Sequence, residues 1–163
     1  IIENISNLKN PKGRFELINF KTNKIIVDYA HTPESISQVI KYVNPYFSKV
    51  VVLFGAGGNR DKEKRKLMGT ASQLADSVIV TNDNPRNEDP IQISNDILKG
   101  CDLSKTTVIL DRKEAITSAI NELKENSVLL VLGKGHEMYQ EINNSHIPFN
   151  DNDFINETIG GLI

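Results

Sequence analysis

The chain has 163 residues, of which 39% are hydrophobic and 25% are charged, a composition typical of one globular domain. Its formal net charge of -2 provides no positive field that would favour nucleic acid or an anionic membrane surface. No apolar run is long enough to cross a bilayer, and the first residues lack the pattern of a signal peptide. We interpret the single cysteine, Cys101, as a small buried hydrophobic side chain, and its lack of a disulfide partner favours a reducing cytoplasm.

Apolar runs and helical patterns alternate along the whole chain. Strands are predicted where β-branched residues cluster, at Lys24–Tyr29, Lys49–Phe54, Ser77–Thr81, Thr106–Leu110 and Ser127–Leu132. Helices are predicted where apolar residues recur at helical spacing, after His31, over Lys62–Leu74, over Pro90–Leu98, after Asp111 and over Asn152–Ile159. Two helix starts carry clear signals. Thr32 is the expected cap of the first helix, with Pro33 at its first position, and Asp111 is the expected cap of the helix that follows it.

The order of these elements predicts an α/β fold. Five strands separated by helices indicate a Rossmann-like, doubly wound, mostly parallel sheet with helices on both faces. One antiparallel edge strand is expected, and Tyr139–Ile142 is the candidate for it. The chain lacks an initiator Met, so we interpret residues 1–12 as a junction from upstream domains and residues 13–163 as one domain.

Chemically active residues gather at one edge of the predicted sheet. In an open parallel sheet, ligands bind beyond the carboxyl ends of the strands. The segments at that edge combine glycine, acid, base and histidine, whereas the opposite edge carries ordinary turn residues. They are Asp28–His31, Gly55–Asp61, Asn82–Arg86 and Gly133–Glu137. This asymmetry predicts a ligand site at the carboxyl-end edge.

The loop Gly55–Asp61 contains three glycines, which allow the backbone to approach a ligand closely. It resembles the dinucleotide fingerprint Gly-x-Gly-x-x-Gly, but Arg60 stands at the third glycine position. A guanidinium there is suited to clamp a carboxylate or a phosphate. The alternative is an ordinary turn with a solvated arginine.

The segment Asp83–Arg86 places an acid, an amide and a base within four residues. Pro85 fixes the backbone ahead of Arg86 and stiffens the loop that presents it. Such a set suits a zwitterion, with arginine for a carboxylate and the acid or amide for an ammonium group. The alternative is a common Asx-type turn.

The segment Gly133–Glu137 again combines glycine with charge. Glu137 is suited to bind a cationic amine, and Lys134 or His136 to face a phosphate. A lone histidine in a turn is more often structural, and this applies also to His31, although Asp28 makes a polar pair with it plausible.

Other motifs of known chemistry do not occur in the sequence. It has no phosphate-binding Gly-x-x-x-x-Gly-Lys-Ser/Thr loop, no cysteine and histidine cluster with zinc spacing, and no Gly-x-Ser-x-Gly elbow. The basic stretch Arg60–Lys66 is interleaved with acids, so we interpret it as a solvated helix face.

Taken together, five motifs resemble the C-terminal domain of the Mur ligase family, in the branch that adds meso-diaminopimelate. The similarity runs from Gly13 to the end of the chain, and the DNPR motif is the signature of that branch. The motifs are Gly13–Glu16, Val27–Pro33, Gly55–Arg65, Asp83–Arg86 and Gly133–Glu137. Two positions depart from the family pattern, because Asn59 stands where aspartate is usual and Lys66 where proline is common.

The resemblance implies a reaction in two steps. ATP phosphorylates the D-glutamate carboxylate of UDP-N-acetylmuramoyl-L-alanyl-D-glutamate, and the amine of the incoming amino acid then attacks the acyl phosphate. The phosphate loop, the magnesium ligands and the UDP-sugar site belong to two preceding domains of the family, so this domain alone is expected to be inactive. Neither a catalytic residue nor a metal ligand is assigned within it. The expected setting is the bacterial cytoplasm, with no nucleic-acid or membrane partner.

The resemblance also assigns binding roles. Arg60 would bind one carboxylate of diaminopimelate, Asn84 and Arg86 the distal carboxylate, and Gly133 and Glu137 the distal ammonium group. Asp83 and Pro85 would shape the recognition loop. The residues that would approach ATP are Arg14, Asp28 and His31.

Four other readings stay open. In a lanthionine-adding ligase, the amino acid would present the same charged groups to the site. In a lysine- or ornithine-adding relative, the amino acid would have no second carboxylate for Arg86 to bind. A nucleotide-binding domain of an oxidoreductase would need glycine where Arg60 stands. A noncatalytic Rossmann-like binding module would share the fold alone.

Overall fold

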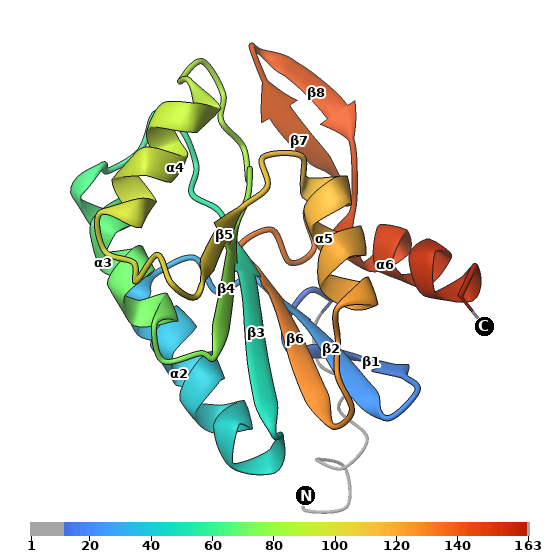
Figure 1. Ribbon diagram of the computed structural model, residues 1–163. Helices are drawn as coiled ribbons and strands as arrows, with labels where there is room; N and C mark the ends of the chain where they lie inside the picture. The colour runs from blue at the N-terminus through green and yellow to red at the C-terminus, as the bar shows by residue number, and fades with distance from the viewer. Residues whose placement is uncertain (1–11, 163) are drawn as a thin grey trace, which may run out of the picture.

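The computed structural model describes residues 12–162 and contains a six-stranded sheet in the order β1-β2-β6-β3-β4-β5 (Figure 1). The predicted junction, residues 1–12, lies outside the described residues apart from Lys12. The strands are β1 (Glu16–Phe20), β2 (Asn23–Asp28), β3 (Lys49–Phe54), β4 (Ser77–Val80), β5 (Thr106–Val108), β6 (Ser127–Leu132), β7 (Tyr139–Ile142) and β8 (Ser145–Pro148). The helices are α2 (Pro33–Val43), η1 (Asn44–Tyr46), α3 (Glu63–Ser72), α4 (Pro90–Leu98), α5 (Arg112–Asn121) and α6 (Asp151–Gly160).

The centre of the sheet is parallel and buried, as the sequence predicts. Strand β6 lies between β2 and β3 and pairs in parallel with both. All six residues of β6 are buried, because helices cover both faces of the sheet. The five predicted strands and the predicted helices are confirmed, with bounds that agree to within two residues.

The antiparallel edge strand exists, but the prediction of its position is wrong. It is β1, which pairs with β2 through a tight turn at Lys21 and Thr22. Strand β1 alternates between buried Ile18 and Phe20 and outward-facing neighbours, which is the two-residue period of a strand with one covered face. Tyr139–Ile142, by contrast, pairs with β8 in a separate two-stranded sheet.

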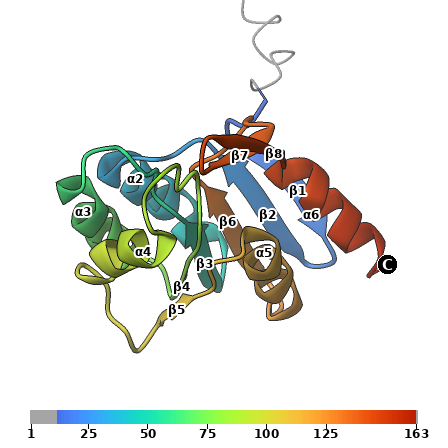
Figure 2. The same ribbon diagram turned by 90° about the horizontal axis from the view of Figure 1, so that it is seen from above.

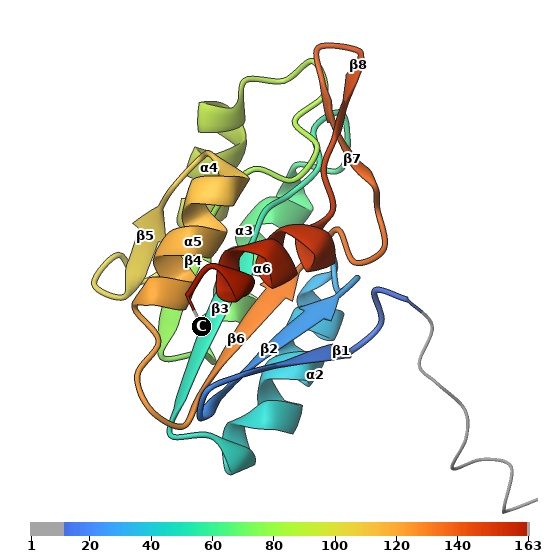
Figure 3. The same ribbon diagram turned by 90° about the vertical axis from the view of Figure 1, so that its right-hand side faces the viewer.

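The β7–β8 hairpin stands above the carboxyl ends of the parallel strands, next to the loop that follows β4 (Figure 3). Its turn is formed by Asn143 and Asn144, both with positive φ, which is the conformation of a type I′ hairpin turn. Ile142 forms an isolated parallel bridge with Arg86. The hairpin therefore extends the loop that follows β4, which contains Arg86, rather than the main sheet.

Helices cover the two faces of the sheet in separate layers. Viewed from above, α2, α3 and α4 lie on one face and α5 and α6 on the other (Figure 2). On the first face, α2 buries Ile36, Ile40 and Val43 at helical spacing. On the second face, α5 buries Ala115, Ile116, Ala119 and Ile120 at helical spacing.

Helix caps fix where two of the loops begin and end. Thr32 caps α2 in a capping box with Ser35, and Pro33 occupies the first turn, both as predicted. Asp111 caps α5 by accepting the backbone N–H groups of Lys113 and Glu114. Because α2 starts directly after β2, the first cap holds the preceding His31 at the carboxyl-end edge of the sheet.

A buried ion pair lies beneath this edge. The Arg112 guanidinium bonds both carboxylate oxygens of Asp151 at 2.8 Å each, and both side chains are fully buried. Arg112 also donates to the carbonyl oxygens of Asn82 (3.2 Å) and Leu132 (3.1 Å). These carbonyls lie where β4 and β6 end, so one guanidinium ties together the starts of two functional loops.

Candidate functional site

A cavity of about 320 Å³ opens at the carboxyl ends of the parallel strands. Its walls come from the loops that follow β2, β3, β4 and β6, which is the position expected for a ligand site in an open α/β sheet. Seven of the residues singled out from the sequence line it: His31, Arg60, Asp83, Asn84, Arg86, Gly133 and Glu137. Arg14, Asp28 and Pro85 are not among the residues that line it.

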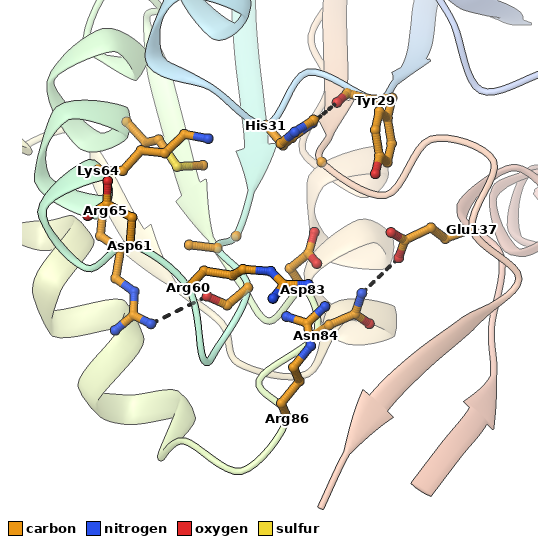
Figure 4. A pocket seen from close by; sticks show the side chains of 15 residues that line it. Tyr29, His31, Arg60, Asp61, Lys64, Arg65, Asp83, Asn84, Arg86 and Glu137 are labelled. Carbon is orange, nitrogen blue, oxygen red and sulfur yellow. Dashed lines mark hydrogen bonds between the residues drawn. The ribbon is translucent and has the colours of Figure 1, made fainter. Parts of the chain in front are cut away.

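The guanidinium groups of Arg60 and Arg86 point into the same part of the cavity (Figure 4). They come from different loops, and both side chains pass close to Gly57, where a β-carbon would lie 2.9 Å from Arg86 Nη1 and 3.6 Å from Arg60 Cγ. Arg86 Nη1 donates to the Gly58 carbonyl oxygen at 2.8 Å, and its Nε pairs with Glu141 at 2.8 Å. The guanidinium of Arg86 is thereby oriented, while the side chain of Arg60 is exposed.

The backbone of Arg86 has a φ of 54°, a left-handed conformation that non-glycine residues adopt at a cost of about 1 kcal/mol. The β7–β8 hairpin offsets this cost. Arg86 N donates to the carbonyl of Glu141 at 2.9 Å, and Asn143 N donates to the carbonyl of Arg86 at 2.8 Å. Pro85 is buried behind the loop, and its carbonyl oxygen faces Gly58 so closely that a β-carbon there would lie 1.8 Å away.

Asn84 and Glu137 form a fixed polar pair that joins the loops after β4 and β6. Asn84 Nδ2 donates to Glu137 Oε2 at 2.8 Å, and Asn84 Oδ1 accepts the N–H of Glu141 at 2.9 Å. Lys134 Nζ bonds both side chains, Glu137 at 2.8 Å and Asn84 at 3.1 Å. Burial acts to raise the pKa of Glu137, but the hydrogen bonds from Lys134 and Asn84 outweigh it, so that the pKa lies below its usual range. Glu137 therefore faces the cavity as a carboxylate.

The suggestion that Lys134 faces a phosphate is wrong, because its side chain is fully buried. Its ammonium group has three acceptors within the chain, which include the carbonyl oxygen of Tyr139 at 2.7 Å. Lys134 is a structural residue that fixes the direction of Glu137.

Asp83 lines the cavity, and no hydrogen bond to its carboxylate is found among the residues described. Burial raises its pKa, and the positive charges of Arg112 and Lys134 oppose the rise. Gly133, with a φ of 109°, lies against this carboxylate, since a β-carbon there would come within 2.7 Å of Asp83 Oδ2. A glycine is required at position 133 for both reasons.

The other side of the edge carries exposed basic side chains around Tyr29. The Arg14 guanidinium lies 4.8 Å from the centre of the Tyr29 ring, and the rings of His31 and His136 lie 4.6 and 5.3 Å from it. Arg14, His31 and His136 are all exposed. This is a cluster of groups suited to an anion. It is held by cation–π and edge-on or tilted ring contacts, and by the contact of His31 Nδ1 with the Tyr29 carbonyl oxygen at 2.7 Å.

Asp28 has a different position from its two predicted companions. Its carboxylate accepts the backbone N–H of Phe15 and of Ala30, each at 2.8 Å. The first bond fixes the turn that carries Arg14, and the second fixes the turn that carries His31. Asp28 thus links the two turns from below.

Three cavity residues lie outside the segments that the sequence placed at this edge: Lys64, Arg65 and Met68. Lys64 and Met68 are four residues apart at the start of α3, so they lie on the helix face that follows Arg60. The four-residue spacing could therefore have predicted that Lys64 and Met68 share the helix face next to Arg60. The interpretation of Arg60–Lys66 as a solvated helix face is wrong for Arg65, whose side chain is 1% exposed.

The arrangement as a whole suits a ligand with several charges of both signs. Arg60 and Arg86 line the same cavity as Asp83 and Glu137, so the anionic and cationic groups of a zwitterion both have partners in it. Within residues 12–162, no group of three or more histidine, cysteine or acidic side chains is placed to hold a metal ion. No helix in the same range is long and apolar enough to span a bilayer.

Comparisons with known proteins agree with this geometry. The family described as "Mur ligase, glutamate ligase domain" matches residues 13–135. A Rickettsia montanensis protein named UDP-N-acetylmuramoyl-L-alanyl-D-glutamate–2,6-diaminopimelate ligase is 45% identical over 163 residues, covering 98% of this chain and 34% of that protein. A protein of the same name from Aquifex aeolicus is 44% identical over 155 residues, covering 93% and 32%.

A solved structure of a ligase with this name superposes with a TM-score of 0.89 at 37% identity, covering 99% of this chain and 34% of the other. The chain therefore spans about a third of the length of the relatives it matches. The similarity in sequence and the similarity in fold lead to the same assignment. The chain belongs to the Mur ligase family, as the C-terminal domain of that family.

Proposed function

We propose that residues 13–163 are the amino-acid-binding and ATP-closing domain of an ATP-dependent ligase, with residues 1–12 as the junction from its upstream domains. The ligase joins meso-2,6-diaminopimelate to UDP-N-acetylmuramoyl-L-alanyl-D-glutamate in peptidoglycan precursor synthesis, in the bacterial cytoplasm. The names of the relatives at 44–45% identity support the reaction. The observation that carries the proposal is the convergence of Arg60 and Arg86 on one cavity opposite Glu137.

The cavity offers a partner for each charged group at the distal end of diaminopimelate. Arg86 and Asn84 bind the distal carboxylate, with the Arg86 guanidinium already oriented by Gly58 and Glu141. Glu137 binds the distal ammonium group together with the backbone of Gly133. The low pKa of Glu137 supports this role, because a carboxylate that stays ionised is the form that pairs with an ammonium ion.

At the proximal end, Arg60 binds the second carboxylate and leaves the reacting amine free. The amine then attacks the acyl phosphate of the nucleotide-linked dipeptide, an amide bond forms and phosphate leaves. The contribution of this domain is positioning, since holding two reactants in line replaces an encounter in solution. No proton transfer is assigned to a residue of this chain.

Arg14, Asp28 and His31 face the nucleotide in this proposal. The exposed Arg14 and His31 suit the phosphates of ATP, and Asp28 acts by fixing the two turns that carry them. The remaining two thirds of the protein, judged from the length of its relatives, supplies most of the ATP and Mg²⁺ site and the site for the UDP-linked dipeptide.

The departure at position 59 does not alter the charge that lines the cavity. Asn59 is exposed, and it has a φ of 53°, a left-handed conformation that asparagine tolerates better than most residues. Its backbone N–H donates to Glu88, and Asn59 is not among the residues that line the cavity. Diaminopimelate therefore remains the proposed substrate, and lanthionine, which carries the same charged groups, is the closest competitor.

The test is an amide-ligation assay of the whole ligase that contains this chain, with meso-diaminopimelate, lanthionine and lysine as acceptors. The wild type is expected to use diaminopimelate and reject lysine, because lysine leaves Arg86 without a carboxylate. Arg86→Ala is expected to lower kcat/KM for diaminopimelate by about 100-fold or more and to leave the low activity with lysine unchanged. Unchanged selectivity in Arg86→Ala would remove Arg86 from this role.

A further inference from the structure

Arg60 and Arg86 lie on loops from different strands, and these loops are in direct contact. The loop that follows β3 carries Arg60, and the loop that follows β4 carries Arg86. Gly58 N donates to the Asn84 carbonyl oxygen at 2.9 Å, and Arg86 Nη1 donates to the Gly58 carbonyl oxygen at 2.8 Å. The relative position of the two guanidinium groups therefore depends on the contact between the loops.

A buried arginine on α3 strengthens this contact. Arg65 is 1% exposed, and its Nη2 donates to both carboxylate oxygens of Glu88 at 3.0 Å each. The same nitrogen lies 3.3 Å from the Gly57 carbonyl oxygen, and Nη1 donates to Asp96 at 3.1 Å. Glu88 also accepts the backbone N–H of Asn59. The Glu88 carboxylate, in the loop after β4, thus binds both the backbone of the loop after β3 and the Arg65 guanidinium.

The charge of Glu88 is essential to this network. Burial acts to raise its pKa, but the N–H of Asn59 and the guanidinium of Arg65 outweigh it and hold the pKa below its usual range. A buried guanidinium that loses one of its carboxylates is left partly uncompensated, which is unfavourable. The ion pair with Arg65 and the hydrogen bond from Asn59 therefore join the two loops.

We propose that Glu88 is a positioning residue for amino-acid recognition, which couples the two loops so that Arg60 and Arg86 reach the same ligand. The inference rests on the proposed function, because the ligand is taken to be a diamino dicarboxylic acid. Glu88 does not line the cavity. Its bond to Asn59 N fixes a left-handed residue directly before Arg60, and this conformation sets the direction in which the Arg60 side chain leaves the backbone.

The test compares Glu88→Gln with Glu63→Gln in the whole ligase. Glu63 is an exposed carboxylate at the start of α3, in the same region of the surface, which makes it a matched control. Glu88→Gln is expected to raise KM for diaminopimelate about tenfold, with kcat and KM for ATP within about twofold of the wild type. Glu63→Gln is expected to leave all three constants unchanged.

A second measurement separates positioning from a general structural effect. In an Arg86→Ala background, Glu88→Gln is expected to raise KM for diaminopimelate less than it does alone, because one of the groups it positions is gone. Glu88→Asp keeps the charge and is expected to restore part of the lost affinity. If Glu88→Gln does not fold, KM for diaminopimelate is measured with Glu88→Asp instead. Folding is checked by circular dichroism at the assay temperature.

Several outcomes would overturn the proposal. An unchanged KM for diaminopimelate in Glu88→Gln, fully additive effects with Arg86→Ala, or loss of folding in both Glu88 variants would leave Glu88 without a positioning role. The proposed function fails separately, if the wild-type ligase does not use diaminopimelate at all.

Discussion

The two halves of the carboxyl-end edge differ in how their side chains are held. In the amino-acid half, Asn84, Arg86 and Glu137 each have at least one hydrogen bond or ion pair of 2.8 Å to another residue of the chain. In the half around Tyr29, Arg14 and His136 are exposed and touch the rest of the site through ring contacts. Hydrogen bonds within the chain order these three side chains, whereas none is found for the Arg14 and His136 side chains among residues 12–162.

This difference corresponds to the two partners that we propose. A small amino acid with four charged groups gains affinity from a site whose side chains are already ordered, because little conformational entropy is lost on binding. A nucleotide held mainly by other domains needs only groups that reach it when those domains approach. The comparison predicts that changes beneath the first half affect the fold, whereas changes in the second half affect one substrate alone.

The largest expected effect comes from Arg112, which lies under the amino-acid half. Arg112→Met leaves Asp151 as an unpaired buried charge and frees two strand-end carbonyls, so the free energy of unfolding is expected to fall by about 3–5 kcal/mol. Urea denaturation followed by circular dichroism measures it. Lys113→Met, at the exposed neighbouring position, is the control and is expected to change the value by less than about 1 kcal/mol. Equal effects would show that the buried pair does not support this half.

A smaller and more selective effect is expected from Arg14. Arg14→Ala removes an exposed guanidinium from the Tyr29 cluster, so KM for ATP is expected to rise about fivefold while KM for diaminopimelate is unchanged. Steady-state kinetics of the whole ligase with each substrate varied in turn measures both constants. Lys41→Ala, an exposed cation on α2, is the control. An equal rise in both constants would contradict the independence of the two halves.

The smallest expected effect concerns Asp83. Its folded-state pKa is raised, so the protonated form favours folding below the unfolded pKa, and this stabilisation is lost as the pH rises through the folded pKa. At pH 7, well above the unfolded pKa, burial of this carboxyl therefore costs stability, and Asp83→Asn is expected to raise Tm by about 2 °C. Thermal melting of both proteins at pH 7 and at pH about 4 tests this, because the difference in Tm should shrink as the wild-type carboxyl becomes protonated. A gain of equal size at both pH values would point to another cause.

Much of the fold and of the cavity could be predicted from the sequence because the strands of a parallel sheet are continuous apolar runs. Lys49–Phe54 and Ser127–Leu132 were predicted with their correct bounds for this reason. Once the strands are known, the segments after them must meet at one edge, which is why Arg60, Arg86 and Glu137 could be placed together. The antiparallel strand could not be assigned as easily, since β1 is short and half exposed and resembles the β7 segment in pattern.

The residues that sequence reasoning misjudged are buried charges. Arg65 looks like a solvated cation in the sequence, because the acids that neutralise it lie far along the chain. Lys134 pairs with the nearby Glu137, but its burial also depends on Asn84 and on the carbonyl oxygen of Tyr139, which come from other segments. Arg65 has Glu88 and Asp96 as partners, both more than twenty residues away. Such pairing depends on how α3 and α4 pack, and no local spacing reports it.

The position of β6 has a consequence for the order of folding. Strand β6 separates β2 from β3, yet it is made about a hundred residues after β2 during synthesis on the ribosome. Until it emerges, the facing edges of β2 and β3 have no partner strand, and such edges are prone to association with other chains. The segment that completes the core continues into Gly133 and Glu137, so a nascent chain acquires its central strand and the last wall of the cavity together.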